Sequence, residues 1–131
     1  MFYKRVKQVF GFGDFADDSS KPFSLIATAD TNQTLVKDTP GLLVGLHAIN
    51  QSAAVKYLKF YDSRSKPVAG AGAPVRRYAI PASATGAGFV VPFFVPARFA
   101  VGIAFTITGA QADGDTTALA AGDVTLTLEY V

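Results

Sequence analysis

Residues 99–108 read Phe-Ala-Val-Gly-Ile-Ala-Phe-Thr-Ile-Thr, and this stretch decides the fold. Large apolar side chains occupy every second position for ten residues, and a period of two is typical of a β-strand with one buried face. Residues 124–130 alternate in the same way, with Thr125, Thr127 and Glu129 between apolar neighbours. The sequence therefore predicts strand structure in both stretches, with the large apolar side chains on one face.

Further strands are predicted upstream of this pair. In Leu42–Ile49, one face carries Leu42, Val44, Leu46 and Ala48, and the opposite face carries His47 and Ile49. In Lys56–Tyr61, Leu58 and Phe60 are predicted to point inward. Shorter candidates are Leu25–Ala29, Thr34–Lys37, Val75–Ile80 and Phe89–Val95, the last with prolines that suit sheet edges or bulges.

Turn signals separate these runs, and no stretch offers ten residues of helical period with caps. Residues 111–122 come nearest and would hold a short helical turn at most. About eight short strands with regularly spaced turns indicate an all-β fold, either an antiparallel β-sandwich or a barrel. We expect a jelly roll, because its two sheets use about eight strands.

The first 22 residues differ from the rest, so we predict an N-terminal arm over 1–22 and a β-sandwich domain over 23–131. A basic cluster is followed by phenylalanines spaced by glycine, and then by aspartates. This segment is too aromatic for a solvated tail, and we expect it to pack on a partner such as a neighbouring subunit. The alternative is an edge strand and turn lying on its own domain. The candidate partner-contact residues are Phe2, Tyr3, Lys4, Arg5, Lys7, Phe10, Phe12 and Phe15.

Composition excludes several classes of protein. The chain has 131 residues, enough for one domain, and 50% hydrophobic residues exclude a disordered chain. The absence of cysteine excludes disulfides, cysteine-based zinc sites and thiol nucleophiles. A net charge of +2 is too small to indicate nucleic-acid binding. The apolar tract 89–110 contains Pro92, Pro96 and Arg98 and has strand alternation, so we expect no membrane span and, at the N-terminus, no secretory signal.

Catalytic and metal-binding candidates are few. His47 is the only histidine and lies in an apolar strand, where a structural role is more typical than a catalytic one. Asp113-Gly114-Asp115 resembles a calcium loop, but position 12 of that loop would be Val124 instead of glutamate. Aspartates that cap their own turn are the favoured interpretation. We therefore expect no catalytic residue, no metal and no cofactor.

A surface of low charge, rich in alanine, glycine and threonine, points to protein partners. Only 17% of residues are charged, and the chain has eleven phenylalanines. Soluble monomers seldom expose large apolar patches, so part of this surface is expected to meet other proteins. The alternative is a large hydrophobic core beneath a surface made mainly of alanine and threonine, with no partner.

Five segments follow one another in a distinctive order: Tyr57-Leu58-Lys59-Phe60-Tyr61, Ile80-Pro81-Ala82, Gly102-Ile103-Ala104-Phe105, Asp113-Gly114-Asp115-Thr116-Thr117-Ala118 and Ala121-Gly122-Asp123-Val124. Together they resemble small structural proteins encoded in the virion-assembly regions of tailed bacteriophages. The similarity extends over residues 42–131, and the arm lies outside it. The resemblance implies a virion protein, a jelly-roll decoration (cement) protein on the capsid, and brings no catalytic residues.

The resulting expectation is a non-enzymatic capsid decoration protein of the virion. It would bind the major capsid protein or other virion proteins and form a homo-oligomer, with a trimer favoured. One alternative is a tail, collar or fibre-attachment protein. A different class is a carbohydrate-binding module, in which Tyr57, Tyr61 and Tyr78 would form the stacking platform, although the absence of tryptophan counts against it.

Overall fold

The computed structural model describes residues 19–131, which form eight strands and no helix. The strands are β1 (Lys21–Ile26), β2 (Thr34–Lys37), β3 (Gly41–Asn50), β4 (Lys56–Asp62), β5 (Arg76–Ile80), β6 (Gly88–Phe99), β7 (Ile103–Thr108) and β8 (Val124–Tyr130). The predicted all-β fold is confirmed. No helix in this part of the chain has the length and apolar character needed to cross a membrane.

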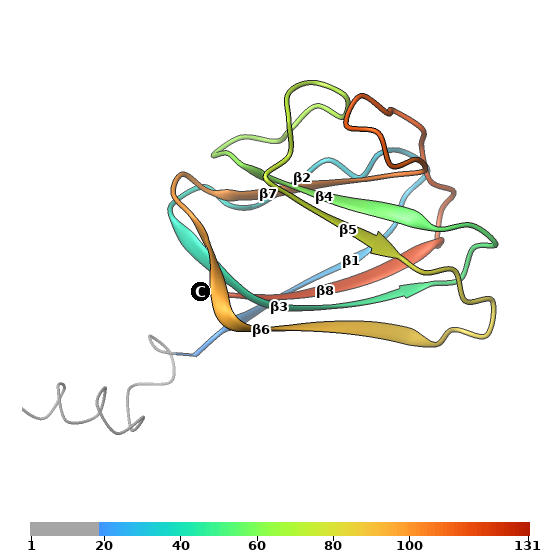
Figure 1. Ribbon diagram of the computed structural model, residues 1–131, viewed down its shortest axis with the longest axis horizontal. Helices are drawn as coiled ribbons and strands as arrows, with labels where there is room; N and C mark the ends of the chain where they lie inside the picture. The colour runs from blue at the N-terminus through green and yellow to red at the C-terminus, as the bar shows by residue number, and fades with distance from the viewer. Residues whose placement is uncertain (1–18) are drawn as a thin grey trace, which may run out of the picture.

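Two four-stranded sheets are stacked face to face (Figure 1). Sheet I has the order β1-β8-β3-β6, and sheet II has the order β2-β7-β4-β5. Every neighbouring pair is antiparallel. The two edges of sheet I are therefore β1 and β6, and this arrangement determines which surfaces are open to a partner.

The core lies between the sheets and is rich in aromatic rings. Phe105 contacts Phe60 with ring centroids 6.0 Å apart and Phe23 at 6.1 Å, both edge to face. This geometry is favoured by the ring quadrupole. Leu58 and Phe60 point inward as predicted, and both are fully buried. Other fully buried members include Leu43, Phe99, Ile103, Ile107, Leu126 and Leu128.

Two irregularities change the predicted strand pattern. A bulge between Leu43 and Gly45 shifts the register of β3, so Leu43 instead of Leu42 joins Leu46 and Ala48 on the core face. The decisive stretch 99–108 is also not one strand. Phe99 ends β6 and Ile103 begins β7, and the three residues between them form a turn. The period of two nevertheless continues across the turn, because Phe99 and Ile103, the residues on either side of it, are both buried in the core.

The largest differences from the predicted strand bounds are in β1 and β6. β1 begins at Lys21, so it includes the last two residues of the predicted arm, and it ends at Ile26 instead of Ala29. β6 continues to Phe99 through both Pro92 and Pro96. Residues 111–122 contain turns and no helix, within the expectation of a short helical turn at most.

The outer faces of the two sheets differ. Loops after β4 and β7 lie over the outside of sheet II (Figure 1), and they bury Lys59, Thr106 and Thr108 beneath them. On the outside of sheet I, His47, Thr127 and Glu129 are half-buried. Sheet I therefore offers the more open face among the described residues.

Candidate functional site

The eight predicted partner-contact residues, Phe2, Tyr3, Lys4, Arg5, Lys7, Phe10, Phe12 and Phe15, lie outside the described residues 19–131. Their predicted role stays a prediction. The described part of the chain offers other candidates, and the most distinctive lies on β6.

An apolar strip runs along β6, the edge strand of sheet I. Phe94 is 100% exposed, Val95 is 81% exposed and Val90 is 66% exposed. Pro92 and Pro96 lie in the same strand and are also exposed. We call these five residues the β6 strip. Large apolar side chains presented together in this way are typical of a surface that binds another protein.

A bulge in β6 accounts for the exposure of this strip. Leu43 pairs with Ala97 and Gly45 pairs with Pro92, so Val44 alone lies opposite the four residues 93–96. The surplus residues break the regular ladder and turn Phe94 and Val95 toward solvent. Phe93 still packs against Tyr78 of β5, with ring centroids 6.1 Å apart, and this contact ties the segment to the core.

A groove of about 310 Å³ adjoins the β6 strip on the outside of sheet I. Gly45 lies at its centre, paired with Pro92 on one side and with Glu129 on the other. The remaining lining residues are Ser20, Val44, Leu46, His47, Val90, Val91 and Thr127. The lack of a side chain at Gly45 leaves this hollow between strands. The groove is apolar toward β6 and polar toward β8.

His47 belongs to the rim of this groove. It pairs with Val90 and Thr127 across the strands, and a Cβ at Gly88 would overlap its Nε2 atom. Within residues 19–131, no serine or carboxylate is hydrogen-bonded to His47. The described residues also contain no cluster of three or more histidine, aspartate or glutamate side chains that would hold a metal ion.

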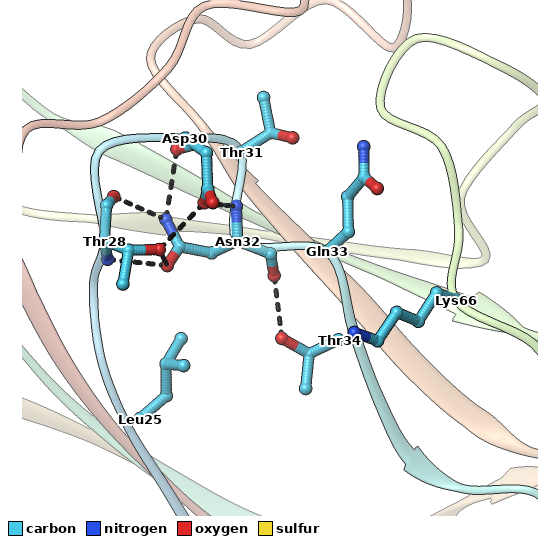
Figure 2. A pocket seen from close by; sticks show the side chains of 8 residues that line it. All are labelled: Leu25, Thr28, Asp30, Thr31, Asn32, Gln33, Thr34 and Lys66. Atoms are coloured by element: carbon cyan, nitrogen blue, oxygen red, sulfur yellow. Dashed lines mark hydrogen bonds between the residues drawn. The ribbon is translucent and has the colours of Figure 1, made fainter.

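A second, polar pocket of about 330 Å³ lies beside the loop between β1 and β2 (Figure 2). Asn32 organises it from a left-handed backbone conformation, with φ of 51°. Its Oδ1 accepts from the Thr28 amide at 2.9 Å, and its Nδ2 donates to the carbonyls of Thr28 and Asp30 at 3.2 and 3.1 Å. These atoms are used to shape the loop, so the geometry explains a stable turn better than a ligand site.

The predicted Asp113-Gly114-Asp115 loop covers sheet II. Asp115 accepts from the Thr117 hydroxyl at 2.7 Å and from the amides of Ala110 and Thr117, and the hydroxyl bond contributes most to lowering the pKa of this carboxyl group. The capping interpretation is confirmed for Asp115. Asp113 instead accepts hydrogen bonds from Nε and Nη2 of Arg77, at 2.6 and 2.7 Å. These hydrogen bonds lower the pKa of the Asp113 carboxyl group.

Lys59 is the buried charge beneath that loop. Its side chain is 1% exposed on the outer face of sheet II, and Nζ donates to the carbonyls of Ala110, at 3.1 Å, and Ala112, at 2.5 Å. Burial lowers the pKa of Lys59, although Asp115 and Asp113 oppose that effect. Lys59 thereby fastens the loop to the sheet.

The three tyrosines of the predicted stacking platform do not form one surface. Tyr78 pairs with Leu58 and packs against Phe60 in the core. Tyr57 and Tyr61 alternate with these residues and therefore belong to the opposite face of sheet II, where Tyr61 is buried. The platform proposed for carbohydrate binding is therefore wrong.

Comparison of the chain with models of known protein families gives no match, and comparison with curated proteins gives no significant match. The β6 strip is the feature that sequence reasoning missed as a site. The sequence feature that could have indicated this site is the pair Pro92 and Pro96 among large apolar residues. In the sequence analysis these prolines predicted a sheet edge or a bulge, but not a surface for a partner.

Proposed function

We propose that the chain is a jelly-roll structural protein of a tailed-phage virion, which binds the assembled capsid shell and stabilises it. The strand pairing supports the jelly roll. β1 pairs with β8, β2 with β7, β3 with β6 and β4 with β5, as in one long antiparallel hairpin that is rolled into two sheets. The resemblance of residues 42–131 to virion structural proteins supports the assembly role.

The β6 strip is the observation that carries this function. Phe94 is fully exposed to water and Val95 is largely exposed, which is unfavourable for apolar side chains. A partner that covers the strip removes this apolar surface from water and so stabilises the complex. Each copy needs only a modest contact, because many copies on a symmetric shell bind together and multiply their individual affinities. The shell would then be reinforced by the surface area buried in these contacts, and no catalysed reaction would be needed.

The basic N-terminal cluster supplies a second contact. Lys4, Arg5 and Lys7 carry positive charge that suits an acidic shell surface. A charge reversal of these three residues to glutamate in the full chain tests this contact. We expect weaker binding to shells, most clearly at low ionic strength, where exposed charges are least screened.

Co-sedimentation with purified shells that lack this protein tests the β6 strip. We expect Phe94→Ser/Val95→Ser to lose at least about tenfold in affinity, since each buried aromatic or aliphatic side chain contributes about 1.5–3 kcal/mol. Ile26→Ser is the matched control, because Ile26 is 68% exposed on β1, the opposite edge of sheet I. Equal binding by the double variant and the wild type would refute the role of the strip.

Cryo-electron microscopy of the intact particle tests the location. Regular density on the capsid exterior is the expected result, and a symmetry axis through three copies would support the favoured trimer. Density confined to the tail or collar would overturn the decoration role while keeping an assembly role for the sandwich. Absence of the chain from particles would refute the proposal.

A further inference from the structure

A second groove lies where β6 ends. This groove has a volume of about 370 Å³ and is lined by Pro40, Gly41, Leu42, Arg98 and Phe99. Leu42 of β3 pairs with Arg98 of β6, so their side chains lie next to each other on one face of sheet I. The groove is therefore apolar except for one guanidinium group.

Arg98 lies on the same face of β6 as Pro96, the last residue of the β6 strip. Ala97 and Phe99 are buried in the core, and neighbouring residues of a strand point to opposite faces. Pro96 and Arg98 are both exposed and point away from the core. Two residues of strand separate their Cα atoms by about 7 Å. The apolar strip and the guanidinium group thus belong to one continuous surface.

The hydrogen-bond donors of Arg98 are available to a partner. Within residues 19–131, its guanidinium group takes part in no ion pair and no hydrogen bond. Asp62 is the carboxylate that Arg98 influences electrostatically, but both oxygens of Asp62 accept hydrogen bonds from the backbone amides of residues 100–102. Glu129 lines the other groove, where it accepts a hydrogen bond from Ser20.

A guanidinium group beside apolar side chains favours a carboxylate as its partner. Its planar fork of N–H donors binds both oxygens of a carboxylate at once. The attraction is stronger where the neighbouring apolar contact excludes water. The backbone of β6 contributes little to such a contact, because Pro92 and Pro96 have no amide hydrogen. A segment that fits this surface therefore carries apolar side chains for the strip and an aspartate or glutamate for Arg98.

We propose that the shell segment that covers the β6 strip is acidic as well as apolar, and that one of its aspartate or glutamate side chains binds the guanidinium group of Arg98. This inference rests on the proposed function, because the partner is the capsid shell. It adds the chemistry of the segment that the shell presents, which has apolar side chains within about 7 Å of a carboxylate.

Co-sedimentation of the full chain with the same purified shells tests the pairing. Arg98→Glu is compared with Lys66→Glu, which changes the net charge by the same amount. Lys66 is exposed beside the loop between β1 and β2, at the edge of the sandwich opposite β6. We expect Arg98→Glu to lose at least about tenfold in affinity and Lys66→Glu less than about twofold, because the repulsion is strong only where the shell carboxylate lies close.

The outcomes separate this inference from the proposed function. If Arg98→Glu binds as tightly as Lys66→Glu while Phe94→Ser/Val95→Ser loses affinity, the carboxylate is overturned and the strip remains the contact. Full binding by all of these variants would refute the strip, and this inference with it. Tighter binding by Arg98→Glu would show that the shell presents a basic group and would also overturn the inference.

A second variant keeps the test valid if the reversed charge disturbs the turn that Asp62 holds. Arg98→Gln removes the positive charge without placing a second carboxylate near Asp62. Where thermal unfolding shows Arg98→Glu to be destabilised by more than about 3 °C, the affinity of Arg98→Gln decides instead. Its affinity is expected to fall at least about threefold, since a charge-assisted hydrogen bond is lost. Unchanged affinity of Arg98→Gln would overturn the inference.

Carbodiimide cross-linking identifies the acceptor directly. Arg98→Lys keeps the positive charge, and the reagent joins an amine to a carboxylate only when the two groups are in contact. Mass spectrometry of the cross-linked shells is expected to join position 98 to an aspartate or glutamate of the shell protein, at a yield well above that of Lys66. Absence of this cross-link in a variant that binds would overturn the proposal. A cross-link from position 98 to a second copy of this chain would also overturn it.

Discussion

Replacement of Asp62 by alanine is expected to destabilise the protein strongly, because this carboxylate holds the turn between β6 and β7. It accepts from the amides of Ala100, Val101 and Gly102 at 3.1, 2.7 and 3.1 Å. A hydrogen bond to a charged group contributes about 1.5–3 kcal/mol when buried. Water replaces part of each bond at this half-exposed turn, so we expect a total loss of about 2–3 kcal/mol.

The assay is thermal unfolding of Asp62→Ala beside Asp38→Ala, which removes an exposed carboxylate from the turn after β2. For a domain of this size, 1 kcal/mol corresponds to about 4 °C, so the Tm of Asp62→Ala should fall by about 8–12 °C near neutral pH. The control should change little. A fall of less than about 3 °C for Asp62→Ala would refute the reasoning.

The pH dependence of this difference has a definite sign. Burial raises the pKa of Asp62, but the amides of Val101, Gly102 and Ala100 outweigh burial and hold the pKa below its usual value of 3.8. A carboxyl group whose pKa is depressed in the folded state adds stability above the unfolded pKa and loses it as the pH falls through the folded pKa. The gap in Tm between wild type and Asp62→Ala should therefore narrow below about pH 3.8. A constant gap would contradict this account.

Three further substitutions separate buried from exposed contributions. Phe105→Ala removes a fully buried ring that contacts two other aromatic rings. Urea denaturation should show that the free energy of unfolding falls by about 3–5 kcal/mol. Asn50→Ala removes the amide that joins the loop before β4 and the end of β5 to β3, and the same assay should show a loss of about 2–3 kcal/mol in the free energy of unfolding, whereas a loss near zero would mean that water replaces these bonds. Arg77→Ala should leave Tm nearly unchanged, because Arg77 and Asp113 are 48% and 42% exposed; a large fall would mean that this ion pair fastens the loop over sheet II.

The strand content could be predicted from the sequence because period-two alternation depends only on neighbouring residues. Thr34–Lys37 and Val124–Tyr130 have the predicted bounds, and turn-forming residues precede each of them, Asn32 before the first and Gly122-Asp123 before the second. The extra residue Val44 in β3 could not be predicted, because it is defined by the partner strand β8, where Leu43 pairs with Tyr130 and Gly45 with Glu129. It moved Leu42 off the predicted face. The exposed Phe94 belongs to a second irregularity, the surplus residues 93–96 of β6, where the prolines had indicated an edge or a bulge.

The burial of Lys59 on the outer face of sheet II could not be predicted from neighbouring residues in the sequence either. Lys59 lies in an alternating strand, where a charged residue indicates a solvated face. It is buried because residues 110 and 112, some fifty positions away, supply its carbonyl partners. The separation of β6 from β7 had one weak signal in Gly102, where a Cβ would overlap the carbonyls of Ser63 and Lys37. In the candidate site, the composition of the β6 strip was visible in the sequence, but its exposure was not.

The prolines of β6 also determine how a partner approaches this edge. An exposed edge strand presents free amides and carbonyls, which invite another strand to extend the sheet. Pro92 and Pro96 have no amide hydrogen to donate, and the surplus residues 93–96 interrupt the regular spacing that strand addition needs. The proposed partner would therefore contact the β6 strip through the side chains of Val90, Phe94 and Val95 instead of through its backbone. The same features that protect the edge from aggregation thus leave a side-chain surface available for specific assembly.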